Sequence, residues 1–123
     1  SGEIVGAWTL DIDALLEEMR EGPDFKKMME SNEAAVRQME EAIRKMRVVI
    51  DLNSDNTFSG TAEGVGNKST VKGTWSLEGE RMTLSTTEED GKAKDPPEAE
   101  VFTFKDNVLI MEKDGIKMTL KRK

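Results

Sequence analysis

A short pattern of glycine, tryptophan and alternating apolar residues occurs twice in this chain of 123 residues. The first copy is Gly6-Ala7-Trp8-Thr9-Leu10 and the second is Gly73-Thr74-Trp75-Ser76-Leu77. Apolar residues at alternate positions share one face of a β-strand, and a glycine lets a neighbouring strand approach closely. The two tryptophans of the chain are large anchors for a core. The pattern therefore predicts an antiparallel sheet that curls around a shared interior.

A helical segment interrupts this β-pattern after a first strand at about residues 4–10. Apolar residues recur from residue 12 to residue 19 at the i, i+3, i+4, i+7 spacing of one helix face. Gly22-Pro23 ends that helix, and a second helical stretch covers about residues 24–45. Ser31-Asn32 lies inside this stretch and is able to cap a new helix, so one long helix and two short helices both remain open. We predict a helical insertion over about residues 11–46.

From Arg47 onward the hydrophobic period is two. Polar or glycine-rich turns separate the strands, and Asp114-Gly115 is a strong hairpin signal. A two-residue turn there pairs Lys113 with Ile116, Met111 with Met118, and Leu109 with Leu120. The charged segment 88–97 ends in two prolines and is predicted to be a loop. The chain is thus predicted to be one domain, 1–123, that is mainly β. Its expected form is an eight-stranded antiparallel up-and-down barrel with helices between strands 1 and 2.

The two glycine-tryptophan strands and the two hairpins give the chain a resemblance to lipocalin-like (calycin-type) small β-barrels. The residues that carry it are Gly6, Trp8, the 73–79 hairpin and Asp114-Gly115. The resemblance implies that a basic residue of the last strand, Arg122, packs over Trp8 as a cation–π pair, with Gly6 as a structural partner. A basic C-terminal tail in solvent is the alternative. Helices that follow strand 1 are a similarity to fatty-acid-binding proteins. Those proteins have ten strands, whereas eight are predicted here, so bacterial lipocalin-like domains of unassigned function are the nearer match.

Composition limits the chemistry that this chain can perform. Cysteine and histidine are absent, which removes the commonest nucleophile, general base and metal ligands, so we expect no enzyme, no cofactor and no metal site. The net charge of -7 argues against nucleic acid as a partner. The segment 51–56 imitates the start of a calcium loop but has Asn56 and Ala62 where glycine and a bidentate acid are required, and it is interpreted as a polar turn. No apolar run is long enough for a transmembrane helix.

The inward-facing residues of the predicted barrel are bulky enough to fill its interior, so a packed core is the default expectation. They are Ile50, Leu52, Phe58, Val71, Trp75, Leu77, Met82, Leu84, Phe102, Phe104, Leu109, Met111, Ile116 and Met118. The alternative is a small apolar, uncharged ligand in space left by small residues on facing strands, beneath a lid of methionine-rich helices. The candidate ligand-binding residues are Phe58, Gly60, Ala62, Gly73, Trp75, Phe102, Phe104, Met111 and Met118.

A different class of function is a protein-protein interaction module. The methionine-rich helical insertion is one candidate surface for it, because methionine side chains adapt to varied partners. The outer face of the sheet is the other, since Val49, Val108 and Ile110 need cover from the helices or from a second subunit. Monomer and dimer both stay open. Ser1-Gly2 is typical of residues left by expression cloning, so we expect that a targeting segment has been removed ahead of it, and the resemblance favours the bacterial periplasm or envelope.

Overall fold

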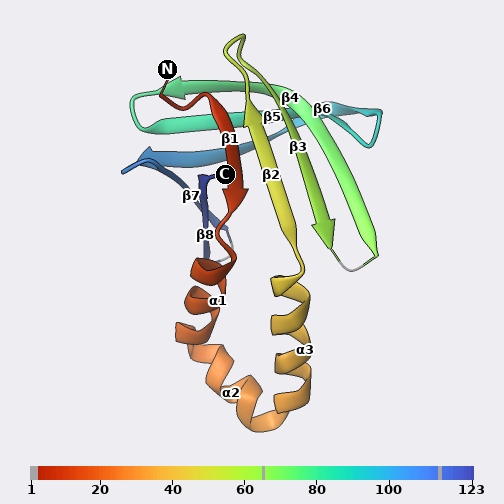
Figure 1. Cartoon of the computed structure of the whole chain (residues 1–123), viewed down its shortest axis with the longest axis vertical. Helices are drawn as coiled ribbons and strands as arrows, with labels where there is room; N and C mark the ends of the chain where they lie inside the picture. Colours follow the sequence, from red (N-terminus) through yellow and green to blue (C-terminus); the bar gives the residue numbers. More distant parts are fainter. Residues whose placement is uncertain (1–2, 65, 114) are drawn as a thin grey trace.

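The strands of this protein close into a single barrel. The computed structural model describes residues 3–64, 66–113 and 115–123. In this part of the chain, eight strands pair in sequence order and β8 returns to β1, all antiparallel (Figure 1). The fold class predicted from the sequence is confirmed. The strands are β1 (Gly6–Leu10), β2 (Arg47–Leu52), β3 (Thr57–Gly64), β4 (Asn67–Glu78), β5 (Arg81–Glu89), β6 (Lys92–Lys105), β7 (Val108–Lys113) and β8 (Ile116–Arg122).

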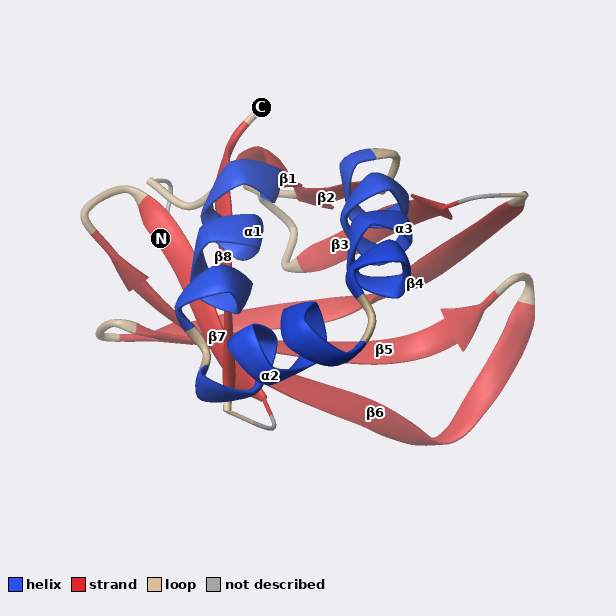
Figure 2. Ribbon diagram, turned by 90° about the horizontal axis from the view of Figure 1, so that it is seen from below, coloured by secondary structure: helices blue, strands red, loops and turns tan. Residues whose placement is uncertain are grey.

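A helical insertion connects β1 to β2, as the sequence predicted, and it consists of three helices within the described residues. They are α1 (Ile12–Glu21), α2 (Pro23–Ser31) and α3 (Glu33–Arg44), and together they form the helical arch, residues 12–44. The arch leaves one end of the barrel, and α1 lies against β8 (Figures 1 and 2). Asn32 divides the second helical stretch, because its side-chain oxygen accepts a hydrogen bond from the Ala35 amide at 3.1 Å and so caps α3. The question of one helix or two is thereby resolved in favour of two.

The predicted loop at residues 88–97 is wrong. β5 continues to Glu89 and β6 begins at Lys92, so the turn between them is only Asp90-Gly91, both with positive φ. The two prolines lie inside β6, where the ladder to β5 is interrupted: Thr86 pairs with Glu98, and the next pair is Glu88 with Ala93. Proline lacks the amide donor that regular strand pairing needs, but in this irregular stretch no paired residue of β5 requires such a donor.

The register of the last hairpin is as predicted. Lys113 pairs with Ile116, Met111 with Met118, and Leu109 with Leu120. Asp114 lies outside the described residues, and Gly115 has a φ of +77°. The first strand differs slightly from expectation, because it begins at Gly6 and not at residue 4.

The main core fills the barrel and extends to the first helix of the arch, where Leu15 of α1 belongs to it. We call the end of the barrel away from the helical arch the sealed end. Almost all predicted inward residues belong to the core or pack against it. The exception is Ile116, which is 43% exposed because it lies at the tip of the β7–β8 hairpin. Val49, Val108 and Ile110 on the outer face are half-buried. The buried barrel residues are Ile4, Trp8, Leu10, Leu52, Phe58, Trp75, Met82, Leu84, Phe102, Leu109 and Leu120.

Candidate apolar binding site

Along β8 and β3, burial of the inward-facing residues falls toward the arch, whereas on β4 and β6 the half-buried Leu77 and Phe104 lie at the opposite end. Along β8, Leu120 is 4% exposed, Met118 is half-buried and Ile116 is 43% exposed. Along β3, Phe58 is buried and Ala62 is exposed. The opposite end, which we call the barrel mouth, comprises the start of β2, the end of β3, the start of β4, the end of β5, the first half of β6 and the β7–β8 hairpin. Partly accessible apolar surface therefore lies at the mouth, next to the arch.

Arg122 and Trp8 close the sealed end. The Arg122 guanidinium carbon lies 4.1 Å from the centre of the Trp8 ring, so the predicted cation–π contact is confirmed. The same guanidinium donates hydrogen bonds to the backbone carbonyls of Val5, at 2.9 Å, and of Glu3. Gly6 has a φ of +132°, and a side chain there would begin 3.1 Å from Arg122 Nη1. This corner therefore depends on glycine as well as on the arginine.

The aromatic residues predicted to bind ligand lie in or beside the core of the sealed end. Phe58, Trp75 and Phe102 are at most 5% exposed. The Trp75 indole N–H donates to the Asn53 carbonyl at 2.9 Å, which fixes the ring to the β2–β3 turn. Phe104 meets Trp8 edge to face, with ring centres 5.9 Å apart. Phe58, Trp75 and Phe102 are packed in the core, whereas the half-buried Phe104 also borders an open depression of about 660 Å³ with Leu77 and Glu80. Any contact of these rings with a ligand stays a prediction.

The small residues and methionines among the nine predicted ligand-binding residues are divided between the core and the mouth. A Cβ on Gly73 would lie 1.9 Å from the Ser85 carbonyl oxygen, so the neighbouring strand already occupies the space that this glycine leaves. A Cβ on Gly60 would lie 3.0 Å from Val71 Cγ2. Met111 and Met118 are directly paired and half-buried, and of the predicted residues they, with exposed Ala62, lie nearest the mouth.

A cavity of about 440 Å³ lies between the helical arch and the β7–β8 hairpin. We call it the arch cavity. Its volume falls in the range of about 300–1,000 Å³ that is typical of small-molecule sites. None of the nine predicted ligand residues lines it. The lining residues are Glu18 and Met19 of α1, Gly22 between α1 and α2, Pro23, Asp24, Phe25 and Met28 of α2, Met39 of α3, and Gly115 and Ile116 of the hairpin.

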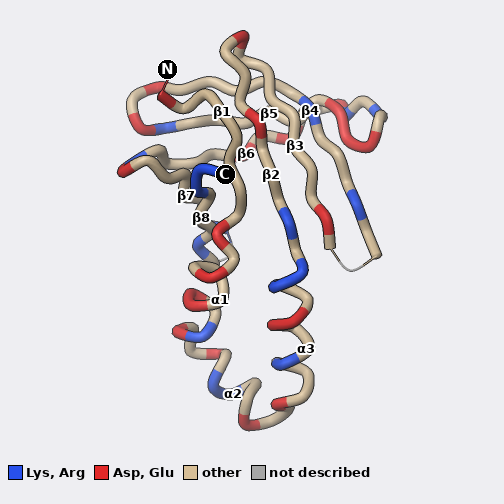
Figure 3. Tube along the Cα trace, in the orientation of Figure 1, with Lys and Arg blue, Asp and Glu red and all other residues tan. Residues whose placement is uncertain are grey.

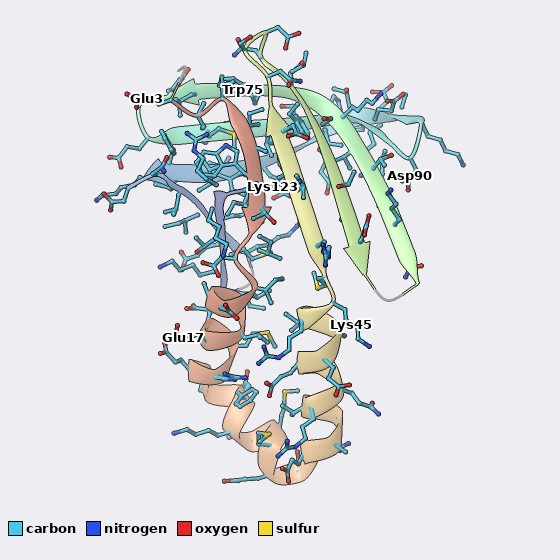
Figure 4. All side chains as sticks on the ribbon, viewed as in Figure 1. Glu3, Glu17, Lys45, Trp75, Asp90 and Lys123 are labelled. Atoms are coloured by element: carbon cyan, nitrogen blue, oxygen red, sulfur yellow. The ribbon has the colours of Figure 1, made fainter. Side chains whose placement is uncertain are left out.

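Two features of the sequence could have indicated this cavity. The methionines of the predicted lid, Met19, Met28 and Met39, come from three successive helices, and Phe25 follows the helix break at Gly22-Pro23. Figure 4 shows sulfur atoms gathered between the helices of the arch. Sequence spacing alone placed these side chains on helix faces, but it did not show that the helices bend back to face one another and the hairpin.

Ion pairs line one wall of the barrel mouth. Glu100 pairs in register with buried Leu84 and thus faces inward, and it lies 3.5 Å from the Lys113 ammonium. Nearer the start of β6, Lys94 contacts Glu89 at 3.1 Å and Glu98 at 2.6 Å. The hydrogen bond from Lys94 lowers the pKa of Glu98, and the bonds to both glutamates raise the pKa of Lys94. The lysines of this wall are therefore neutralised by neighbouring carboxylates.

The calcium-like segment, residues 51–56, comprises the last two residues of β2 and the turn that leads to β3. The Asp55 carboxylate accepts hydrogen bonds from the Thr57 amide at 3.1 Å and from the Thr57 hydroxyl at 2.5 Å, which lowers the pKa of Asp55. This carboxylate is engaged in the turn itself. In the described ranges we find no group of three or more acidic, histidine or cysteine side chains placed to hold a metal ion. No helix in these ranges has the length and apolar character needed to cross a bilayer.

No protein-family model matches the chain, and a search of curated proteins finds no match either. Among solved structures, the chain is similar to two chains described as the REP1-NXSQ fatty acid transporter, one of which is a mutant. The sequence identities are 12% for the mutant and 13% for the other, and each match has a TM-score of 0.43. The matches cover all of this chain and 100% and 98% of those chains, respectively. This degree of likeness assigns neither a family nor a function to the protein.

Proposed function

We propose that this protein is a non-enzymatic binding protein that holds a small apolar molecule in the arch cavity. The observation that carries the proposal is a cavity of about 440 Å³ lined mostly by apolar side chains from three helices and one hairpin. The non-enzymatic part of the proposal is supported by composition, because the chain has no histidine or cysteine to act as base or nucleophile.

Exposure of large apolar side chains supports this location. Among the residues whose burial is described, three large hydrophobic side chains are strongly exposed, and two of them line the arch cavity. They are Met28, 42% exposed, and Ile116, 43% exposed. Apolar surface gathered in one concave place is typical of a binding site, whereas single exposed hydrophobic residues elsewhere need no explanation.

Flexibility of the lining supports an elongated or irregular ligand. Methionine has three rotatable bonds and a polarisable thioether, so Met19, Met28 and Met39 are able to adapt to different shapes. The half-buried Met111 and Met118 continue the apolar surface from the hairpin into the barrel. A ligand longer than the arch cavity would therefore extend between the arch and the barrel mouth.

A fluorescent titration tests this function. The probe is N-phenyl-1-naphthylamine, which is uncharged and brightens in an apolar environment, added to protein stripped of co-purified lipid. We expect saturable binding of one probe with a Kd on the order of 10 µM. Met28→Gln keeps the side-chain length but makes it polar, and we expect it to weaken binding about 3- to 10-fold through the loss of apolar contact.

The matched control is the next residue in the chain. Met29 lines a different depression, among charged side chains of α1 and α3, and not the arch cavity. Met29→Gln should therefore leave the Kd of the probe unchanged. Absence of saturable binding, or equal loss of affinity in both variants, would contradict the proposal.

Docking of another protein is the second candidate, favoured by the position of α2. This helix has no buried residue and contacts the other two helices of the arch. Native mass spectrometry separates the candidates, because a retained small molecule supports the binding function, whereas a stable protein complex that blocks probe binding supports docking.

A further inference from the structure

The polar side chains of the arch cavity carry one sign of charge. Its described lining includes the carboxylates of Glu18 and Asp24 and contains no lysine or arginine. Glu18 is half-buried, and Asp24 is exposed in the first turn of α2. In the described part of the chain neither carboxylate takes part in an ion pair. Both negative charges are therefore available to a ligand.

Lys117 shares a neighbouring depression with Glu17, Glu18 and Glu21, where the three carboxylates outnumber it. The other basic residues near the cavity do not offset its charges. Lys113 is the register partner of Ile116, a lining residue, but its ammonium is already paired with Glu100 at 3.5 Å. Lys26 and Lys27 on α2 are exposed and do not line the cavity. Figure 3 shows acidic positions along α1 and α2 on the arch. A carboxylate or sulfate head group in the cavity would meet two carboxylates and find no cationic partner.

We propose that the arch cavity binds a cationic amphiphile, an apolar chain or ring system that bears a protonated amine or a quaternary ammonium group. This inference rests on the proposed function and names its ligand class. The apolar part contacts Met19, Met28 and Ile116, and the cationic head lies between Glu18 and Asp24. Phe25 lies next to Asp24 in the lining, and aromatic rings attract cations.

Three probes with the same ten-carbon chain test the ligand class. Decyltrimethylammonium, 1-decanol and decanoate are compared at concentrations below micelle formation, by displacement of N-phenyl-1-naphthylamine from the wild-type protein. We expect the cation to displace the probe about 10-fold more tightly than the alcohol, and decanoate to bind more weakly than the alcohol. The preference for the cation should shrink as salt rises, because screening weakens charge attraction at partly exposed sites.

A pair of double variants separates local charge from the charge of the whole molecule. Glu18→Gln with Asp24→Asn removes both cavity carboxylates, and we expect the cation and the alcohol to become equal while displacement by the alcohol persists. Glu17→Gln with Glu21→Gln makes the same change in net charge on α1, outside the lining of the arch cavity. Figure 4 shows Glu17 on the side of α1 that faces away from α3. The control variant should keep the preference.

The outcomes are distinguishable. Loss of the preference only in the first variant supports the inference. Equal or tighter binding of decanoate, or equal loss in both variants, overturns the ligand class while leaving an apolar site intact. Failure of N-phenyl-1-naphthylamine itself to bind overturns the ligand class together with the proposed function.

Discussion

Replacement of Arg122 by methionine should destabilise the protein by about 3 kcal/mol. The stacking of the guanidinium on Trp8, at 4.1 Å, contributes roughly 1 to 2 kcal/mol in this partly buried setting. The hydrogen bonds to the carbonyls of Val5 and Glu3 contribute about 1 kcal/mol each, and the bond to Asn107 at 3.2 Å is exposed and adds little. For a domain of this size, about 3 kcal/mol lowers the Tm by roughly 10 °C.

Arg122→Lys should fall between the wild type and Arg122→Met. A lysine ammonium retains the charge, but it lacks the planar fork that donates to two carbonyls while lying flat on an indole. We expect a loss of about 1 to 2 kcal/mol. Thermal and urea unfolding followed by tryptophan fluorescence measures both variants.

The control for this series is the preceding residue. Lys121 has an exposed side chain, and Lys121→Met changes the net charge by the same amount as Arg122→Met. It should leave the Tm nearly unchanged. A double-mutant cycle adds Trp8→Leu, in whose background Arg122→Met should cost about 1 to 2 kcal/mol less. Equal melting of Lys121→Met and Arg122→Met, or zero coupling to Trp8, would refute the account of the sealed end.

Three further predictions concern the barrel. Gly73→Ala should cost about 3 kcal/mol or more, because the new methyl group overlaps a β5 carbonyl. Gly64→Ala, with open space around it and no positive φ, should gain about 0.4–1 kcal/mol. Urea unfolding measures both, and a similar effect of the two changes would contradict the close packing of Gly73 against β5. Trp75→Ala should cost roughly 3–5 kcal/mol, and an unchanged Tm would place this ring outside the core. The pKa of Glu98 in the folded protein is below its usual value, so its pairing with Lys94 stabilises the fold above the unfolded pKa of Glu98, and this stabilisation is lost as pH falls through the folded pKa. The pKa of Lys94 is raised, so its contribution to stability is full below the unfolded pKa of Lys94 and is lost as pH rises through the folded pKa. The Tm difference between wild type and Lys94→Met should thus be constant near neutral pH and shrink in acid, and a difference that grows in acid would show that this pair does not stabilise the fold.

The strand register was predictable because side-chain alternation and turn chemistry act locally. A one-residue slip would turn Leu109, Met111, Met118 and Leu120 out of the barrel together, so the Asp114-Gly115 turn and the hydrophobic pattern had to agree. The contact of Arg122 with Trp8 was accessible for a similar reason, since closure of an antiparallel barrel brings the end of the last strand beside the first.

The course of β6 was not predictable from the same rules. Two prolines normally end a strand, but here the partner strand β5 has an irregular register opposite them, between Thr86 and Glu88. Nothing in the sequence marks that irregularity as clearly as the prolines mark a break. The bulge at Gly73 is of the same kind, because its reason is a contact with Ser85 on another strand.

The candidate site was missed for a related physical reason. Small residues inside the barrel were expected to leave space for a ligand. In a barrel of eight strands, however, neighbouring strands readily fill the space beside such residues, as they do at Gly73 and Gly60. The arch cavity lies instead where the side chains of neighbouring segments cannot interdigitate. The arch turns back on itself at Gly22 and Asn32, and its short helices meet the tip of a hairpin with flexible methionines between them.

This placement separates the parts of the protein that fix its shape from the part proposed to bind. The sealed end has Trp8 and Trp75 held by hydrogen bonds to backbone carbonyls, and Arg122 fixes the start of the chain to its end. The arch has fewer buried side chains, with Leu16 and Val36 the ones buried outside the main core cluster in the described residues. A site at the least buried part of the fold is able to open for a ligand without disturbing the barrel core. Ligand binding should therefore slow backbone hydrogen exchange in α2 and α3 and leave exchange in β1 and in residues 119–122 of β8 unchanged. Protection confined to the sealed end would contradict this division.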